Sequence, residues 1–324
     1  MRVGKLSSKE LNELILNKTA PTRSEVLVSA GVAEDCAAVK CDDFLLLTSD
    51  PITSACANSG RLAILISSND IASSGGEPFA CLLTIIAPSF ATAEDIAEIM
   101  DDAYATASKL NIDIIGGHTE FSDSVNRTIL SCTMLGKASN VVTTGGAKPF
   151  DSIIMTKTAG IEATSILAND FEARLISGGL SLDEIAEAKA YIDNISVLNE
   201  GRIAVKVGVN SMHDITEGGV YGAVAEMCEA SGLGAYVLAD KIPVSELTLK
   251  ICSILNIEPK RLISSGSMIM TTQSPEKLIY ELEKVGICAT KIGEMNDKKR
   301  IVASFKGVET LLSVTPDELL KIKR

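Results

Sequence analysis

Acidic residues stand where several apolar runs of this sequence stop. Asp50 closes the run 44–49, and Asn69-Asp70 closes the run that begins at Leu62. Asp35 lies one residue before an apolar segment, and Asp214 lies one residue before Ile215. Carboxylates at the ends of core elements can hold oxygen-preferring divalent cations, and such cations carry phosphates. The pattern therefore indicates a protein that handles Mg-nucleotide.

A glycine-containing segment, Gly116-Gly117-His118-Thr119-Glu120, follows the short apolar run 112–115. Glycines at such a point let the backbone approach a phosphate closely. Imidazole is a poor Mg²⁺ ligand, so His118 would donate to a phosphate oxygen or exchange a proton near neutral pH. The alternative is a histidine that is hydrogen-bonded into a turn. Glu120 is a second carboxylate available in the same segment.

Each of these residues also has an ordinary structural interpretation. Asp35 and Asp50 could cap local turns, and Asn69-Asp70 could be an interior pair that bonds to the backbone. Asp214 or Thr216 could cap the helix that follows Gly218-Gly219, whose N–H groups would otherwise face an anion. Gly145-Gly146 could be an interdomain turn, and Lys5 a solvated side chain near the terminus.

Composition excludes several classes of function. The 324 residues carry a net charge of −12 and no basic patch, so we expect no nucleic-acid partner. No apolar run approaches the roughly 20 residues that span a bilayer, so we expect no membrane association. The eight cysteines are scattered, with no C-x-x-C pair, and no secretory leader is evident, which favours a cytoplasmic protein.

Periodicity predicts alternating strands and helices in the first half. Helices are expected over 8–17 and 61–73, and another after Thr92, where Asp95 stands three residues on as in a capping box. Strands are expected over 36–40, 44–48, 79–87, 112–115 and 128–136.

A glycine- and proline-containing passage, 143–151, interrupts the pattern and places a domain boundary at about residue 147. The second half restarts with a strand over 152–157. Helices are expected over 160–168, 181–191, 220–230 and after Ser274, and further strands over 268–271, 289–293 and 301–305. The sequence thus predicts two α/β (α+β) domains, residues 1–147 and 148–324.

Five segments, in this order and at this spacing, resemble the aminoimidazole-ribotide synthetase (AIR synthase-related) superfamily. They are Glu34–Val39, Thr48–Thr53, Asn69–Pro78, Gly116–Glu120 and His213–Gly219. That superfamily includes thiamine-monophosphate kinase, selenophosphate synthetase and the hydrogenase-maturation carbamoyl dehydratase, and the last branch is the most similar.

The resemblance implies an N-terminal dimerising sheet domain that binds ATP and a C-terminal α+β domain, in a homodimer. It implies roles in the reaction for Asp70, His118 and Asp214. The implied Mg²⁺ ligands are Asp35, Asp50, Asp70 and Asp214. The implied nucleotide-binding residues are Lys5, Asp35, Asp50, Asn69, Gly116, Gly117, His118, Thr119, Gly145 and Gly146.

The sequence departs from the superfamily pattern at three places. Carbamoyl dehydratases end in a cysteine, whereas no cysteine follows Cys288 here, and they usually show Glu where Ser265 stands. The kinase branch has an acidic residue where His118 stands. We therefore expect a Mg-ATP enzyme that activates or phosphorylates an oxygen of a small acceptor or carboxamide. The alternatives are an ATP-binding maturation partner without turnover and a kinase of thiamine monophosphate.

Overall fold

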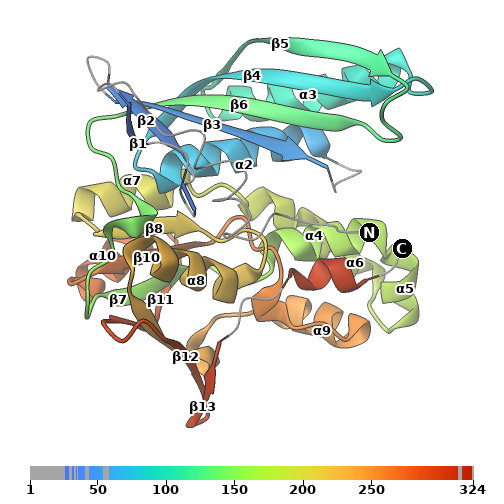
Figure 1. Ribbon diagram of the computed structural model, residues 1–324. Helices are drawn as coiled ribbons and strands as arrows, with labels where there is room; N and C mark the ends of the chain where they lie inside the picture. Colours follow the sequence, from blue (N-terminus) through green and yellow to red (C-terminus); the bar gives the residue numbers. More distant parts are fainter. Residues whose placement is uncertain are drawn as a thin grey trace.

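The computed structural model describes residues 26–28, 31–32, 34, 36–40, 44–53, 58–312 and 316–322. The predicted helix over 8–17, Lys5 and Asp35 lie outside these residues. The described chain forms two sheets, each with its own set of helices (Figure 1).

The first sheet has six strands in the order β1-β2-β3-β6-β4-β5. Neighbouring strands are antiparallel except β4 and β5, which are parallel and are connected through α3. The strands are β1 (Val26–Val28), β2 (Ala37–Lys40), β3 (Phe44–Ile52), β4 (Glu77–Pro88), β5 (Asp113–Ser122) and β6 (Ile129–Ala138).

Helices α2 (Ser59–Ser73) and α3 (Ala93–Lys109) lie along one face of this sheet (Figure 1). Helix α2 is buried along most of its length, including the polar run 67–70, because it packs between the sheet and the second half of the chain. Helix α3 starts with the predicted capping box, in which Thr92 and Asp95 exchange hydrogen bonds.

The second sheet has seven strands in the order β13-β12-β9-β11-β7-β10-β8, antiparallel except for β12 and β9. Its strands are β7 (Ser152–Thr156), β8 (Ser211–Asp214), β9 (Gly234–Leu238), β10 (Met268–Thr272), β11 (Ala289–Asn296), β12 (Ile301–Phe305) and β13 (Val308–Leu311). Its helices are α4 (Ile161–Asp170), α5 (Glu172–Ser177), α6 (Leu182–Lys189), α7 (Leu198–Val207), α8 (Gly219–Ser231), α9 (Glu246–Leu255) and α10 (Pro275–Glu283).

Helix α2 joins the two halves. It packs against α7 and β8 of the second half, and Gly201 of α7 permits this approach. A Cβ at position 201 would lie 2.6 Å from the carbonyl oxygen of Ala72. Ile161 and Ile195 of the second half belong to the same buried cluster as the side chains of the first sheet. The core is therefore continuous across the boundary.

Most predicted elements are present, and several were not predicted: β1, α5, α7, β8, β9, α9 and β13. The predicted end of the strand at residue 115 is wrong, because β5 continues through 116–120 to Ser122. Cys81, Cys132 and Cys228 are buried and free. No helix in the described part of the chain is long and apolar enough to cross a membrane.

Candidate active site

Asp70 lies near the end of α2, on the side that faces β3. Asp70 is only 5% exposed, and its Oδ2 accepts a hydrogen bond of 2.5 Å from Oγ1 of Thr48. The Cys36 thiol donates to the main-chain oxygen of Asp70 at 3.2 Å. A carboxylate that is this well buried requires polar or cationic partners. Thr48 supplies one and fixes the orientation of the group.

Asp50 lies two residues beyond Thr48 on β3. Because side chains alternate along a strand, Asp50 and Thr48 share the face of the sheet that α2 covers. The separation of such neighbours along a strand is about 7 Å. The structure therefore places Asp50 and Asp70 on the same side of the first sheet.

Asn69 has a different role from the predicted contact with phosphate. Its Nδ2 donates to the carbonyl oxygen of Ile195 at 2.8 Å, and its Oδ1 accepts from the N–H of Val197 at 2.9 Å. The residue is fully buried. These two bonds account for the side chain by holding α2 to the segment that precedes α7. The contacts of Asn69 are thus structural ones between the two halves.

Asp214 is the last residue of β8 and is 1% exposed. Strand β8 packs against α2, so Asp214 and Asp70 belong to two elements in direct contact. The loop after Asp214 leads to Gly218 and Gly219, both with positive φ, at the start of α8. A Cβ on Gly219 would lie 2.6 Å from the carbonyl oxygen of Lys260, so glycine is required there.

The start of α8 does hold an anion, and that anion is part of the chain. Oδ2 of Asp317 accepts from the N–H of Gly218 at 2.9 Å, and its Oδ1 accepts from the N–H of Leu319 at 2.8 Å. Burial raises the pKa of Asp317 to about 6 despite these bonds, and the charge of Glu217 adds to the effect. The N–H of Gly218 is therefore already engaged, which corrects the expectation that it faces a ligand.

Glu162 was not identified from the sequence, yet it lies close to the predicted residues. It is the second residue of α4 and only 3% exposed. Burial raises the pKa of Glu162 to about 7; the nearby Ser265 hydroxyl opposes this, and the charges of Glu217, Asp317 and Asp50 add to it. Asp50 comes from the first sheet and the others from the second half. Both halves thus contribute carboxylates to one region. We call these four residues the acidic cluster: Asp50, Glu162, Glu217 and Asp317.

The segment around His118 lies elsewhere. Residue 118 pairs with Thr84 of β4, and its side chain is 64% exposed and 3.3 Å from Oε2 of Glu120. Thr84 points away from α2, since its neighbours Leu83 and Ile85 are the buried residues of that strand. Within one chain, the sheet therefore separates His118 from Asp70. The structure therefore does not bring His118 and Asp70 together in one copy of the protein.

The glycines of the two predicted phosphate loops have structural reasons to be glycine. Gly117 has φ +147°, and a Cβ there would lie 1.9 Å from the carbonyl oxygen of Leu83, its pairing partner on β4. Gly145 and Gly146 approach the carbonyl oxygens of Ala230 and Asn210. Ala230 lies at the C-terminal end of α8, whereas Gly218 lies at its N-terminal end. The structure therefore does not bring Gly145 and Gly146 to the acidic cluster.

The donor set suits Mg²⁺ only in part. Among the described residues, no three acidic, histidine or cysteine side chains lie close enough together to hold a metal ion by themselves. Mg²⁺ is usually held by one or two carboxylates together with waters and substrate phosphates. The oxygen-only side chains of Asp50 and Asp70 fit such an arrangement, whereas a ready-made four-carboxylate cage is not present in this part of the chain.

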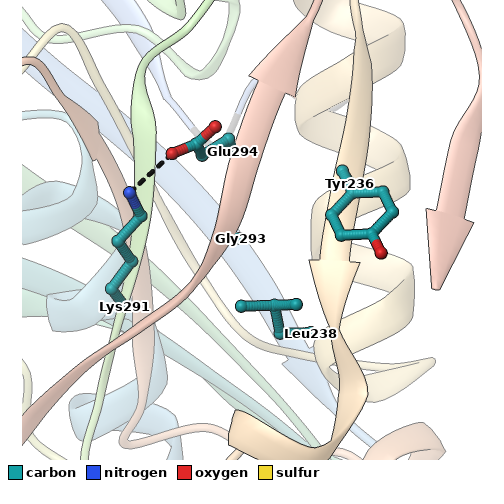
Figure 2. A pocket seen from close by; sticks show the side chains of 5 residues that line it. All are labelled: Tyr236, Leu238, Lys291, Gly293 and Glu294. Atoms are coloured by element: carbon teal, nitrogen blue, oxygen red, sulfur yellow. Dashed lines mark hydrogen bonds and ion pairs between the residues drawn. The ribbon is translucent and has the colours of Figure 1, made fainter. Parts of the chain in front are cut away.

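A separate hollow of about 270 Å³ lies on the second sheet (Figure 2). Tyr236 and Leu238 of β9 and Lys291, Gly293 and Glu294 of β11 line it. Nζ of Lys291 and Oε1 of Glu294 form an ion pair of 2.6 Å at its edge. None of these residues belongs to the acidic cluster, so the hollow is not part of the candidate site.

Sequence comparison finds relatives whose names refer to hydrogenase formation and to carbamoyl dehydration. A protein of Methanocaldococcus jannaschii, named for hydrogenase expression and formation, is 30% identical over 223 residues, 67% of this chain and 63% of the relative. Carbamoyl dehydratase HypE of Cupriavidus necator is 22% identical over 279 residues, 81% of this chain and 76% of that protein. The chain thus spans a little under two thirds of the first relative.

Solved structures share the fold. HypE in the HypE–HypF complex has a TM-score of 0.76 at 20% identity, covering 94% of this chain and 99% of that chain. AaThiL complexed with AMPPCP and TMP has a TM-score of 0.75 at 19% identity, covering 96% of each chain. These similarities confirm the predicted two-domain α/β fold.

The family match extends over both halves. Residues 33–138 match the N-terminal domain of AIR synthase related protein, and residues 148–306 match its C-terminal domain. The chain belongs to the AIR synthase related family.

Proposed function

We propose that this protein is a Mg-ATP-dependent enzyme that activates or phosphorylates an oxygen of a small acceptor or carboxamide. The observation that carries the proposal is the position of Asp70, which is buried near the end of α2 and hydrogen-bonded to Thr48 of β3, on the side of the first sheet that also carries Asp50. Helix α2 also contacts β8 of the second half, whose last residue is Asp214. A relative of the same fold binds the nucleotide AMPPCP, which supports ATP as the ligand.

In this proposal Asp50 and Asp70, with Asp214 and Asp35, hold Mg-ATP. Bound Mg²⁺ would neutralise charge on the β- and γ-phosphates and align them for transfer. The contribution of the chain is positioning: Thr48 fixes the carboxylate of Asp70, and the core behind α2 keeps that helix in place. Burial of these groups strengthens their interaction with a cation.

Calorimetric titration with Mg·AMPPCP tests this proposal. We expect the wild-type chain to bind it only when Mg²⁺ is present. Asp240→Asn provides a matched control, because Asp240 is exposed and outside the site. Absence of Mg-dependent nucleotide binding by the wild-type chain would refute the proposal.

We also propose a homodimer formed through the outer face of the first sheet, the face that α2 and α3 do not cover (Figure 1). Leu82 is 41% exposed on this face, beside Thr84 and His118. A second copy would cover Leu82 and would bring His118 to an interface. Sedimentation should show a dimer that Leu82→Glu dissociates, whereas Leu249→Glu, at a similarly exposed leucine of α9, should leave it intact.

A second candidate is a maturation partner that binds ATP without turnover. The HypE–HypF complex supports it, because a structure of the same fold is found with a partner protein. Steady release of ADP in the presence of an acceptor would exclude this candidate. Thiamine monophosphate, the third possibility, can be tested as acceptor in the same assay. The predicted cytoplasmic location remains a prediction.

A further inference from the structure

The hollow on the second sheet has two walls of different chemistry (Figure 2). Tyr236 and Leu238 of β9 form an apolar wall. Lys291 and Glu294 of β11 form a charged wall, in which they are joined by an ion pair of 2.6 Å. Gly293 lies between these two residues on β11 and adds no side chain to fill the space. The hollow thus combines apolar surface with one positive and one negative group.

An irregularity in β11 creates the charged wall. On a regular strand, side chains three residues apart point to opposite faces of the sheet. The pairing of β11 with β7 shifts between Lys291 and Gly293, where β11 advances by two residues and β7 by one. Such a bulge changes the direction of the side chains that follow it, and bulges are frequent next to functional sites. Here the bulge brings Lys291 and Glu294 to one face, where they form their ion pair.

The hollow lies on the face of the second sheet opposite α8. Ala235 and Val237 of β9 pack in the core with α8, and Tyr236 alternates with them, so it points to the other face. Lys291 pairs with Ile154, which packs with α7 and α10 on that other face. The side chains of the ion pair are 40% and 57% exposed, so the hollow is open to solvent.

The size and charges of the hollow determine the class of ligand. Its volume of about 270 Å³ is below that of pockets for drug-sized molecules, so the ligand is small. A cation is repelled by Lys291, and an anion is repelled by Glu294 and by the net charge of −12 of the chain. A zwitterion with an apolar side chain is compatible with both walls. An exposed ion pair contributes little to stability, so its opening by such a ligand costs little.

We propose that this hollow binds an apolar α-amino acid as a zwitterion. Nζ of Lys291 donates to the α-carboxylate, and the α-ammonium donates to the carboxylate of Glu294. The side chain of the ligand packs on Leu238 and on the ring of Tyr236, which favours an aromatic side chain. Binding here requires neither nucleotide nor Mg²⁺ and uses no residue of the acidic cluster, so the site goes beyond the proposed function.

Titration of the ¹⁵N-labelled full chain with L-phenylalanine measures this binding through the NMR signal of the Gly293 amide. Three further probes each lack one part of the ligand: hydrocinnamate lacks the ammonium, phenethylamine lacks the carboxylate, and glycine lacks the side chain. We expect a saturable shift with L-phenylalanine, with a Kd of about 1 mM. Each of the other probes should bind at least about tenfold more weakly, because one of its contacts is missing.

Substitutions distinguish a specific site from adsorption to the surface. Lys291→Met, Glu294→Gln and Leu238→Ala should each weaken binding of L-phenylalanine by about tenfold. Lys284→Met is the matched control, because Lys284 forms an ion pair with Glu281, also three residues apart, outside the hollow. Its affinity for L-phenylalanine should equal that of the wild type.

The comparison of probes uses the wild-type chain alone, so it stands even if a variant does not fold. Absence of a saturable shift at Gly293 with L-phenylalanine would overturn the proposal. Equal binding of hydrocinnamate or phenethylamine, or an unchanged affinity in both Lys291→Met and Glu294→Gln, would do the same. A failure of the chain to bind Mg·AMPPCP would refute the proposed function and would leave this site unaffected.

Discussion

Substitution of Glu162 by Gln should change how the stability of the protein depends on pH. The pKa of this carboxyl rises from an ordinary value of 4.5 to about 7 on folding, chiefly because the group is buried. Between these values the unfolded chain is ionised while the folded chain still holds the proton. Folding is therefore opposed increasingly as pH rises, and the full penalty is reached above about pH 7.

The size of the penalty follows from the shift. One pKa unit corresponds to about 1.4 kcal/mol, so a rise of this size costs the folded wild-type chain about 3 kcal/mol above pH 7 and nothing below pH 4. Glutamine has nearly the same shape and carries no charge. The difference in unfolding free energy between Glu162→Gln and the wild type should thus grow in favour of the variant by about 3 kcal/mol from pH 4.5 to pH 8.

Urea denaturation at a series of pH values measures this difference directly. Glu294→Gln is the matched control, because the side chain of Glu294 is 57% exposed and its removal should give a difference nearly independent of pH. Parallel stability curves for Glu162→Gln and the wild type would refute the reasoning. Such a result would mean that water or a cation reaches Glu162 and keeps its pKa near the ordinary value.

Three further predictions concern the first half. Asp70→Asn should weaken binding of Mg·AMPPCP by about tenfold or more in calorimetry, because a carboxylate oriented by Thr48 is lost. Asn69→Ala should lower the unfolding free energy in urea by about 2 kcal/mol or more, because it removes two buried hydrogen bonds to the second half. Gly117→Ala should lower the same quantity by about 1–3 kcal/mol, through its positive φ and its contact with the Leu83 carbonyl oxygen.

Local sequence signals predicted local structure well. The predicted capping box of Thr92 with Asp95 is present, because it depends only on residues three apart, and α6 begins with a second capping box, of Ser181 with Glu184. The apolar run that starts at Leu62 forms the buried helix α2. The helix expected over 220–230 ends at Gly232, which has the positive φ common at glycine after a helix. In each case, the interaction that sets the structure lies within one turn of the chain.

The errors arise where distant parts of the chain decide the structure. The predicted strand over 112–115 is too short, because pairing with β4 extends β5 through Gly116 and Gly117 to Ser122. Glu162 was missed because its significance depends on Ser265 and Asp50, which are remote in sequence. One signal was available: an acidic residue between Ile161 and Ala163, in a helix whose other residues are largely apolar.

The convergence of like charges is itself evidence that packing imposes the arrangement. Glu217, Asp317 and Asp50 each disfavour the charged form of Glu162, so their approach to it costs electrostatic free energy. Contacts elsewhere oppose this: Asn69 bonds to the segment before α7, Gly201 lets α7 reach α2, and the two halves share a buried core. A cation carried by a nucleotide would reverse the sign of the local interaction. The fold therefore holds in place, by apolar packing and hydrogen bonds, a group of carboxylates whose repulsion a Mg-nucleotide would relieve.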